Sequence, residues 1–402
     1  MKYISRHLYS KRIVPFIDKP IIKVLTGQRR VGKSFVLYQL MDEIRSSNPD
    51  ANIIYINKEL EEFFPIQTHT DLLKHVKGKL KKEKNYLFID EIQEIASFQL
   101  ALRTLLASGN CDIYCTGSNA NLLSGELATL LSGRYISFNI HSLSYQEFLE
   151  FHQLADQFDN LLKYLQYGGM PFLPTIGLTE ELPFEYLRNV YATILLKDVV
   201  ARENIRNISF LENLVLYLAD NTGSLFSATN ISKFLKSQRV DISTQLTINY
   251  LKALANAFII HKVARSEIGG LKIFEVGEKY YFEDLGVRNA IVGFRQRQDL
   301  HKLLENAVYL YLIQQEFSVT VGKLKNKEID FVASRNGAKV YVQVCLTLTS
   351  EETSEREFGN LLKIPDNYPK YVVTLNDPII GENQYGILHK NLIDFLAIDL
   401  AS

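Results

Sequence analysis

The sequence is short of three things, namely cysteine, long apolar runs and net charge. Its three cysteines, Cys111, Cys115 and Cys345, are too few for a disulfide framework or a four-ligand zinc site, so we expect reduced thiols. No apolar run approaches the roughly 18 residues that a membrane span needs. The basic stretch 1–12 also lacks the apolar core of a signal peptide. We therefore expect a cytoplasmic protein that has no membrane partner.

The net charge of zero hides regions of opposite sign. The 45 basic and 45 acidic residues are unevenly spread, with a net charge of +3 in residues 1–150, −3 in 151–205, +3 in 206–295 and −3 in 296–402. Neutrality alone therefore does not exclude nucleic acid. Region 206–295 is the part that we expect to contact DNA if the protein binds it, but the charge there is small for an affinity that depends on phosphate contacts.

The first 145 residues alternate apolar runs with segments of helical periodicity, which predicts a parallel sheet built from β-α-β units. The runs have the continuous apolar character of strands buried on both faces, and they cover residues 21–26, 53–57, 86–89, 112–116 and 135–140. Residues 146–205 are helical and acidic. Residues 206–295 show three helices and then a hairpin, the order of a winged helix. Residues 296–402 indicate a separate α/β domain.

Residues 27–34, Gly-Gln-Arg-Arg-Val-Gly-Lys-Ser, match the phosphate-loop pattern G-x-x-x-x-G-K-[ST] between a predicted strand and a predicted helix. The glycines let backbone N–H groups wrap a phosphate, and the helix directs its positive end at it. We expect Lys33 to reach the β- and γ-phosphates and Ser34 to ligate Mg²⁺. The expected nucleotide contacts are Gly27, Gln28, Arg29, Arg30, Val31, Gly32, Lys33, Ser34 and Phe35.

A second motif, residues 86–91, is an apolar run that ends in Asp90 and Glu91. Open α/β sheets bind ligands at the carboxyl ends of their strands, where these acids would lie. We expect Asp90 to hold Mg²⁺ and Glu91 to orient and deprotonate the attacking water, a pair that suits hydrolysis.

Two further positions are candidates for catalysis. The predicted strand 112–118 ends in polar residues that could sense the γ-phosphate, with Ser118 as first choice and Thr116 or Asn119 as alternatives. Arg134 is a candidate arginine finger, acting in cis or in trans, although a solvated surface arginine fits the pattern equally well.

Together these motifs resemble the AAA+-like P-loop ATPases of bacteria and archaea that carry a C-terminal domain of unknown function. Three further segments are similar to those of this family, namely residues 143–148, 168–171 and 281–286. It implies a P-loop ATPase core over 1–145, a helical lid over 146–205 and a winged helix over 206–295. Relatives of this kind bring a proline-bearing turn near the nucleotide, which would give that role to Gly169 and Pro171; a plain helix break is the alternative.

The C-terminal part, 296–402, resembles a restriction-endonuclease-like α/β domain. Nucleases of that fold need an acid on a first helix, an Asp on a strand and Asp/Glu-x-Lys on the next strand. Glu305 and Asp330 occupy the first two places, whereas Gln343 and Cys345 stand where the acid and the lysine belong. A neutral amide is a poor ligand for a hard cation and a thiol supplies no ammonium, so we predict a degenerate, inactive site.

The main hypothesis is therefore an ATPase with ATP and Mg²⁺ as cofactors, in which hydrolysis moves the lid and the winged helix. The alternative is a nucleotide-gated module that binds DNA or a protein, with hydrolysis incidental. A Mg²⁺-dependent nuclease is the less favoured third hypothesis. A protein partner or a homo-oligomer fits the first two hypotheses.

Overall fold

The computed structural model describes residues 3–400 except 124–130, 132, 180, 238–241, 269–276, 349, 379–380 and 383–384. The chain forms two compact units, the first comprising Met1–His141 with Asn256–Phe258 and the second Ser142–Ala255 with Ile259–Ser402. Within the described part of the chain, no helix is long and apolar enough to cross a membrane.

The first unit contains the predicted parallel sheet, with the strand order β2-β3-β4-β1-β5. Every neighbouring pair of strands is parallel. The strands are β1 (Ile22–Thr26), β2 (Asn52–Asn57), β3 (Asn85–Asp90), β4 (Cys111–Gly117) and β5 (Tyr135–Asn139). All five positions of β1 and all six of β3 are buried, as expected for strands covered on both faces. The expectation of an α/β fold with a parallel sheet is confirmed for this unit.

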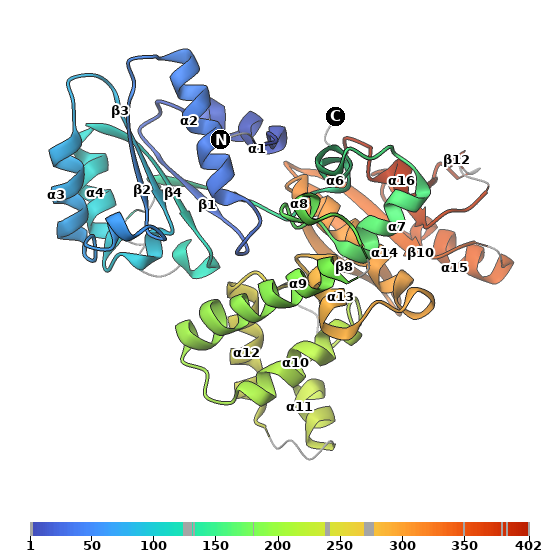
Figure 1. The fold of residues 1–402 in the computed structure, drawn as a ribbon. Helices are drawn as coiled ribbons and strands as arrows, with labels where there is room; N and C mark the ends of the chain where they lie inside the picture. Colours follow the sequence, from blue (N-terminus) through green and yellow to red (C-terminus); the bar gives the residue numbers. More distant parts are fainter. Residues whose placement is uncertain are drawn as a thin grey trace. The chain divides into compact units, whose positions relative to one another are not determined.

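Helices cover both faces of this sheet (Figure 1). The chain crosses from β1 to β2 in one direction along the sheet and returns through β3 and β4, so right-handed crossovers place α2 on one face and α3 and α4 on the other. The helices and single turns are α1 (His7–Ile13), η1 (Val14–Phe16), α2 (Lys33–Ser47), η2 (Glu61–Phe63), α3 (His69–Lys79), η3 (Ile92–Glu94), α4 (Phe98–Ser108) and η4 (Ala120–Leu123). A capping box between Thr68 and Asp71 starts α3.

The second unit begins with helices. These are α6 (Tyr145–His152), α7 (Phe158–Tyr167), α8 (Leu173–Ile176), α9 (Leu182–Thr193), the π-helical segment η5 (Ile194–Ala201), α10 (Ile208–Asp220), α11 (Ala228–Ser237) and α12 (Thr244–Asn256). Aromatic and aliphatic side chains of α6 and α7 share one apolar core with the long helix α14 (Gln296–Gln314).

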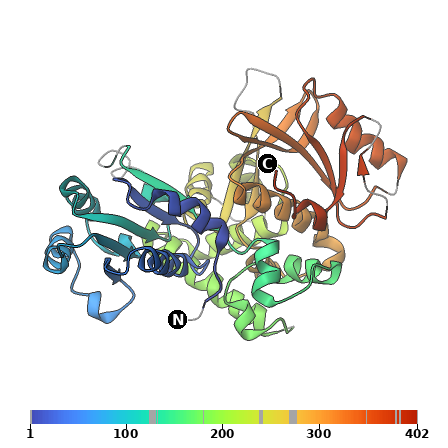
Figure 2. The same ribbon diagram turned by 90° about the horizontal axis from the view of Figure 1, so that it is seen from above.

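An eight-stranded mixed sheet completes the second unit, in the order β12-β13-β11-β10-β9-β8-β6-β7 (Figure 2). Its strands are β6 (Ile260–Glu267), β7 (Glu278–Phe282), β8 (Ser318–Leu324), β9 (Lys327–Arg335), β10 (Ala338–Cys345), β11 (Lys370–Thr374), β12 (Gly381–Glu382) and β13 (Leu388–Asn391). Its remaining helices are α13 (Leu285–Val292), α15 (Glu351–Leu362) and α16 (Leu392–Phe395). Val340 and Val342 pack in the core with α14, whereas Tyr341, which points the opposite way, packs with α15.

The hairpin expected as the wing of a winged helix also belongs to this sheet. The first residues of β6 pair with β7, and Arg265 to Glu267 pair with β8 in parallel. Strand β6 lies before the predicted domain boundary at 295–296 and β8 after it, and the two strands are hydrogen-bonded to each other. The Gly269-Gly270 turn expected from the sequence lies outside the described residues.

Candidate nucleotide-binding site

The phosphate-loop residues 27–32 join β1 to α2, and both motif glycines have positive φ, 150° at Gly27 and 94° at Gly32. A Cβ on Gly27 would lie 2.1 Å from the carbonyl oxygen of Ile140, so only glycine fits there. Gly32 is the N-cap residue of α2 and adopts the left-handed conformation. The loop therefore has the backbone shape that its sequence motif predicts.

Lys33 is the first residue of α2, and its side chain is almost wholly buried. Its Nζ donates hydrogen bonds of 2.9 Å to the carbonyl oxygens of Gly27 and Gln28. The ammonium group is thus held inside the curve of the loop, at the positive end of the helix. Ser34 and Phe35 follow in the first turn, with the Phe35 ring exposed.

Asp90 ends β3, and its carboxylate is held by neutral hydroxyl groups. Thr116 Oγ1 donates to Asp90 Oδ1, and Tyr55 Oη donates to Asp90 Oδ2 at 3.3 Å. Thr116 Oγ1 also accepts the backbone N–H of Glu91 at 3.0 Å. Because β4 lies between β3 and β1, Thr116 stands between the acid pair and the strand that leads into the phosphate loop.

Glu91 is buried and has a strained backbone, with φ of 56° in a residue other than glycine. Its carboxylate accepts a hydrogen bond from Gln93 Nε2. Thr116, one of the three polar residues expected at the end of β4, hydrogen-bonds Asp90 and Glu91; Ser118 and Asn119 are also buried.

The sequence did not indicate Arg6 and Tyr9. Arg6 contacts both the phosphate loop and His141, and Tyr9 contacts His141. Arg6 Nη1 donates to the carbonyl oxygens of Val31 at 3.0 Å and His141 at 2.8 Å, and Tyr9 Oη accepts the backbone N–H of His141 at 2.9 Å. Arg6 lies 4.6 Å from the Tyr9 ring centroid, in a cation–π arrangement. The basic N-terminal stretch was the available signal, but nothing in its pattern pointed to the loop.

The other expected residues of this unit occupy different places. Gln28 is buried, and its Nε2 donates to the carbonyl oxygen of Phe258 at 2.9 Å. Arg29 forms an ion pair of 3.3 Å with Glu59, and Arg30 is exposed with φ of 74°. Arg134 is exposed and precedes β5, where its carbonyl oxygen accepts the N–H of Ile22. Since Ile22 begins β1 and the phosphate loop follows the end of β1, Arg134 lies at the far end of the sheet from the loop of its own chain.

Gly169 and Pro171 belong to the second unit, in the turn after α7. Asp284, the N-cap residue of α13, holds this turn by accepting the backbone N–H of Gly169 at 2.7 Å. Its other oxygen accepts the N–H of Val287 at 2.8 Å, and burial raises the pKa of Asp284 to about 6. The two sequence segments 168–171 and 281–286 are therefore brought together by one carboxyl group.

The nuclease-like residues lie on α14, β9 and β10 of the second unit. Glu305 and Asp330 both contact the ammonium group of Lys279, a residue of β7 that the sequence did not single out. Gln343 Oε1 accepts the N–H of Asp330 at 3.3 Å. Burial raises the pKa of Cys345 to about 12, so this thiol stays neutral.

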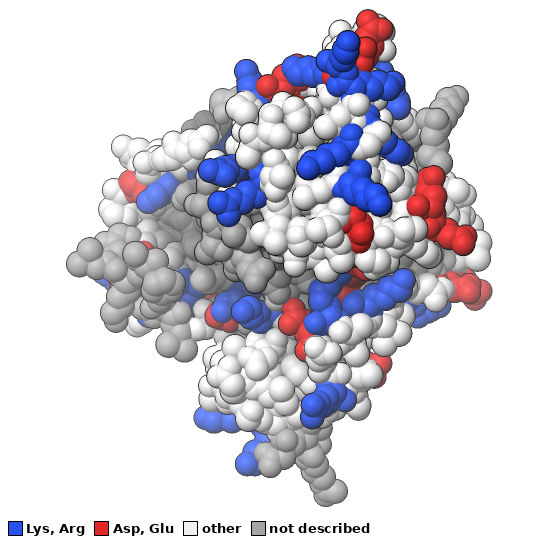
Figure 3. Space-filling model, turned by 90° about the vertical axis from the view of Figure 1, so that its left-hand side faces the viewer, with Lys and Arg blue, Asp and Glu red and all other residues white. Residues whose placement is uncertain are grey.

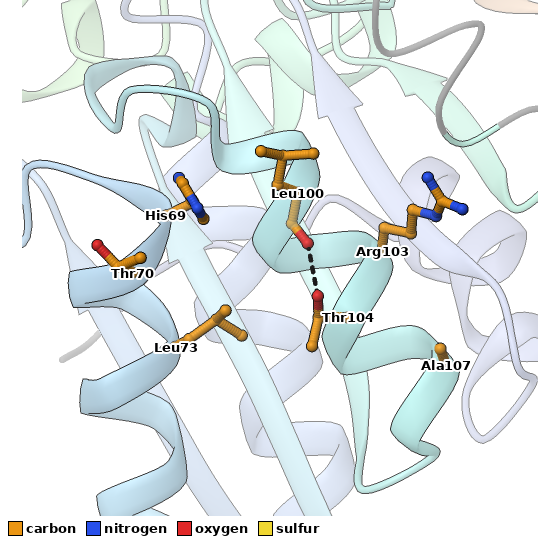
Figure 4. A pocket seen from close by; sticks show the side chains of 7 residues that line it. All are labelled: His69, Thr70, Leu73, Leu100, Arg103, Thr104 and Ala107. Atoms are coloured by element: carbon orange, nitrogen blue, oxygen red, sulfur yellow. Dashed lines mark hydrogen bonds between the residues drawn. The ribbon is translucent and has the colours of Figure 1, made fainter.

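A hollow of about 510 Å³ lies between α3 and α4 (Figure 4). None of the predicted site residues lines it. One of its side chains is cationic, that of Arg103, and the Thr104 hydroxyl donates to the carbonyl oxygen of Leu100 beside it. The remaining lining residues are His69, Thr70, Leu73 and Ala107.

Two family models match parts of this chain. A family of AAA domains matches residues 19–149, and a domain of unknown function (DUF8612) matches residues 158–298. An uncharacterized protein of Haemophilus influenzae is 38% identical over 92% of this chain and 93% of its own length. The uncharacterized protein MJ1544 of Methanocaldococcus jannaschii is 31% identical over 89% of this chain and 82% of its own.

Among solved structures, the Orc1 protein of Aeropyrum pernix in complex with DNA covers 71% of this chain and 90% of its own, with 12% identity and a TM-score of 0.31. That score is too low to compare sites. The AAA match includes the phosphate loop and the Asp90-Glu91 pair, and the two relatives match nearly the whole chain. The chain belongs to a family of AAA+ P-loop proteins, shared with these bacterial and archaeal relatives, in which a domain of unknown function follows the AAA domain.

Proposed function

We propose that the protein binds and hydrolyses ATP with Mg²⁺ in its first unit. The observation that carries this proposal is the Thr116 hydroxyl, which bonds both Asp90 and the backbone of Glu91 next to the strand that leads into the phosphate loop. An acid pair fixed in this way provides a metal ligand and a base at one edge of the sheet.

The residues present fit a nucleotide with its metal ion. The loop has two positive-φ glycines, and one of them excludes a Cβ, so its backbone N–H groups can approach a phosphate closely. Ser34 and Asp90 are the oxygen ligands that Mg²⁺ prefers, and the ion would neutralise charge on the phosphates.

Each residue has a separate role in this proposal. Lys33 exchanges its two carbonyl partners for phosphate oxygens, so its bonds to Gly27 and Gln28 hold it ready. Glu91 takes a proton from the attacking water once its carboxylate leaves Gln93. Thr116 holds Asp90 and Glu91 next to each other, and Ser118 remains our first choice for the residue that senses the γ-phosphate.

Two variants test the proposal. Lys33→Ala is expected to lose ATP binding or turnover, whereas Glu91→Gln is expected to bind ATP but hydrolyse it slowly. Glu94→Gln is a matched control, because Glu94 is an exposed acid three residues further along. ATP binding is followed by fluorescence and turnover by phosphate release. Undiminished turnover in Glu91→Gln would remove Glu91 from the role of base.

Other parts of the expected function remain proposals. We infer that turnover moves the lid (146–205) and the winged helix (206–295), with Gly169 and Pro171 contributing to nucleotide contact. Arg134 is proposed to act in trans, on the site of a second copy, because it lies at the far end of its own sheet. Dependence of specific activity on protein concentration would support this role, and its absence would argue against it.

A second candidate function, binding of DNA gated by the nucleotide, is favoured by one surface. Six exposed lysines, Lys74, Lys77, Lys79, Lys81, Lys82 and Lys84, lie on α3 and in the loop before β3. Figure 3 shows basic side chains gathered on this face of the molecule. Region 206–295, with its net charge of +3, remains the other candidate for contact with DNA. Measuring ATP turnover alone, with double-stranded DNA and with single-stranded DNA at two salt concentrations separates the candidates.

A further inference from the structure

The second unit encloses one lysine ammonium group among three carboxylates. Lys279 Nζ lies 2.8 Å from Glu305 Oε1, 3.0 Å from Glu328 Oε1 and 3.3 Å from Asp330 Oδ1. The lysine side chain is only 4% exposed. It comes from β7, and the acids come from α14 and β9. Lys279 therefore faces three carboxylates in a largely buried place, and Arg265 Nη2 lies 3.7 Å from the second oxygen of Glu328.

The neighbouring carboxylates keep Lys279 in its protonated, charged form. Burial lowers the pKa of Lys279, but Glu305, Asp330 and Glu328 together raise it by more, so the ammonium form persists. Burial raises the pKa of Glu305 to about 7, although Lys279 opposes this change. The carboxylate of Glu305 thus needs a nearby cation to stay ionised at neutral pH.

Hydrogen bonds orient the acids toward one point. The Tyr281 hydroxyl donates to Glu305 Oε1, and the backbone N–H of Val344 donates to Asp330 Oδ2, which leaves Asp330 Oδ1 for the ammonium. Oxygen atoms that converge in this way are the ligands of hard divalent cations. An ammonium group has three donors, and here each of the three carboxylates lies within reach of them.

We propose that Lys279 is the resident cation of this carboxylate site, in the position that a divalent metal ion would take, and that it excludes metal ions from the site. Glu357 is a fourth acid close enough to Asp330 to be affected by its charge. It is buried, its Oε1 accepts hydrogen bonds from Arg356 Nε and Nη2, and Asp330 adds to the rise in its pKa that burial causes. The four acids Glu305, Glu328, Asp330 and Glu357 therefore outnumber the three cations Lys279, Arg265 and Arg356, and removal of Lys279, the most buried of the three, leaves a site that attracts a metal ion.

The test is Mn²⁺ binding to the full chain without nucleotide. We expect the wild-type protein to show no binding at this site, and Lys279→Met to gain one Mn²⁺, bound at least tenfold more tightly than any by the wild type. Calorimetry and the electron paramagnetic resonance of free Mn²⁺ measure this. Lys279→Met with Asp330→Asn, and Lys279→Met with Glu305→Gln, should lose the gain.

Lys262→Met is the matched control, because Lys262 lies on the neighbouring strand β6, is half exposed and pairs with Glu278. It should bind no additional Mn²⁺. Equal Mn²⁺ binding by Lys279→Met and the wild type would overturn the proposal.

Lys279→Met leaves three acids without the cation that they share, so a second variant adds Glu328→Gln to remove one of them and to guard against unfolding. We expect this double variant to bind Mn²⁺ and to unfold at a higher temperature with Mn²⁺ than without. A folded double variant that gains no Mn²⁺ contradicts the proposal. Failure of both variants to fold even with Mn²⁺ also contradicts it, because a filled cation site would restore the charge balance.

Discussion

Replacement of Arg6 by alanine tests whether the N-terminal segment supports the phosphate loop. Arg6 Nη1 donates to two carbonyl oxygens, those of Val31 in the loop and His141, and the guanidinium faces the Tyr9 ring. A hydrogen bond from a charged donor contributes about 1.5–3 kcal/mol, and a desolvated cation–π contact contributes up to about 2 kcal/mol. Arg6 is 3% exposed, so solvent replaces these contacts poorly. We expect the variant to lose about 3–5 kcal/mol of unfolding free energy.

The same change should weaken ATP binding. Val31 lies within the loop, and a carbonyl that has lost its donor leaves the loop free to shift, so we expect at least a tenfold higher Kd, equivalent to about 1.4 kcal/mol. Urea unfolding measures the stability, and titration with a fluorescent ATP analogue measures the affinity. Lys11→Ala on the same helix is the control, because Lys11 is exposed. A loss below about 1 kcal/mol with an unchanged Kd would refute this account of Arg6.

Three further predictions concern single residues. Gly27→Ala should abolish ATP binding while the second unit stays folded, because the new Cβ would meet the Ile140 carbonyl; binding and circular dichroism check this. Asp299→Ala should cost about 3–5 kcal/mol, because it leaves the fully buried Arg288 without its 3.1 Å partner. Burial opposes ionisation of Asp299, but the interaction with Arg288 outweighs it and lowers the pKa of Asp299 to about 2. The difference in unfolding free energy between wild type and variant should therefore persist down to pH 4 and shrink only as the pH falls toward 2. Burial raises the pKa of Asp284 to about 6 in the folded protein, above its value in the unfolded chain, so the protonated form favours folding. The unfolding free energy of the wild type should therefore decrease as the pH rises from 4 to 6. The unfolding free energy of the wild type minus that of Asp284→Asn should therefore be smaller at pH 7 than at pH 4 by about 2–3 kcal/mol. The same value at both pH values would contradict this prediction.

The parallel sheet and the phosphate loop could be predicted because their determinants are local. Apolar runs such as residues 86–89 are long enough to require burial on both faces, and the spacing of Gly27, Gly32 and Lys33 is set by the backbone shape of a single turn. Asp90 and Glu91 follow a strand directly, so their place at the carboxyl edge depends only on the strand's direction.

The contacts that support these motifs could not be predicted, because they join residues far apart in the chain. Arg6 meets His141 across 135 positions, and Asp284 meets Gly169 across 115. Thr116 bonds Asp90 because of the register between β3 and β4, which apolar patterning does not specify. The pairing of β6 with β8 likewise depends on an edge that no local signal marks.

The two acidic sites of the chain differ in how their charge is balanced, and this difference decides where a metal ion is needed. In the first unit, the hydrogen bonds of the Asp90 carboxylate come from the neutral hydroxyls of Thr116 and Tyr55, so its negative charge remains available to a cation. In the second unit, the charge of Asp330 is met by the ammonium of Lys279. A divalent ion should therefore be required by the nucleotide site and excluded from the carboxylate site, although both sites contain buried acids on or next to strands. Local sequence cannot distinguish these cases, because the deciding cation belongs to a strand 51 positions away from Asp330.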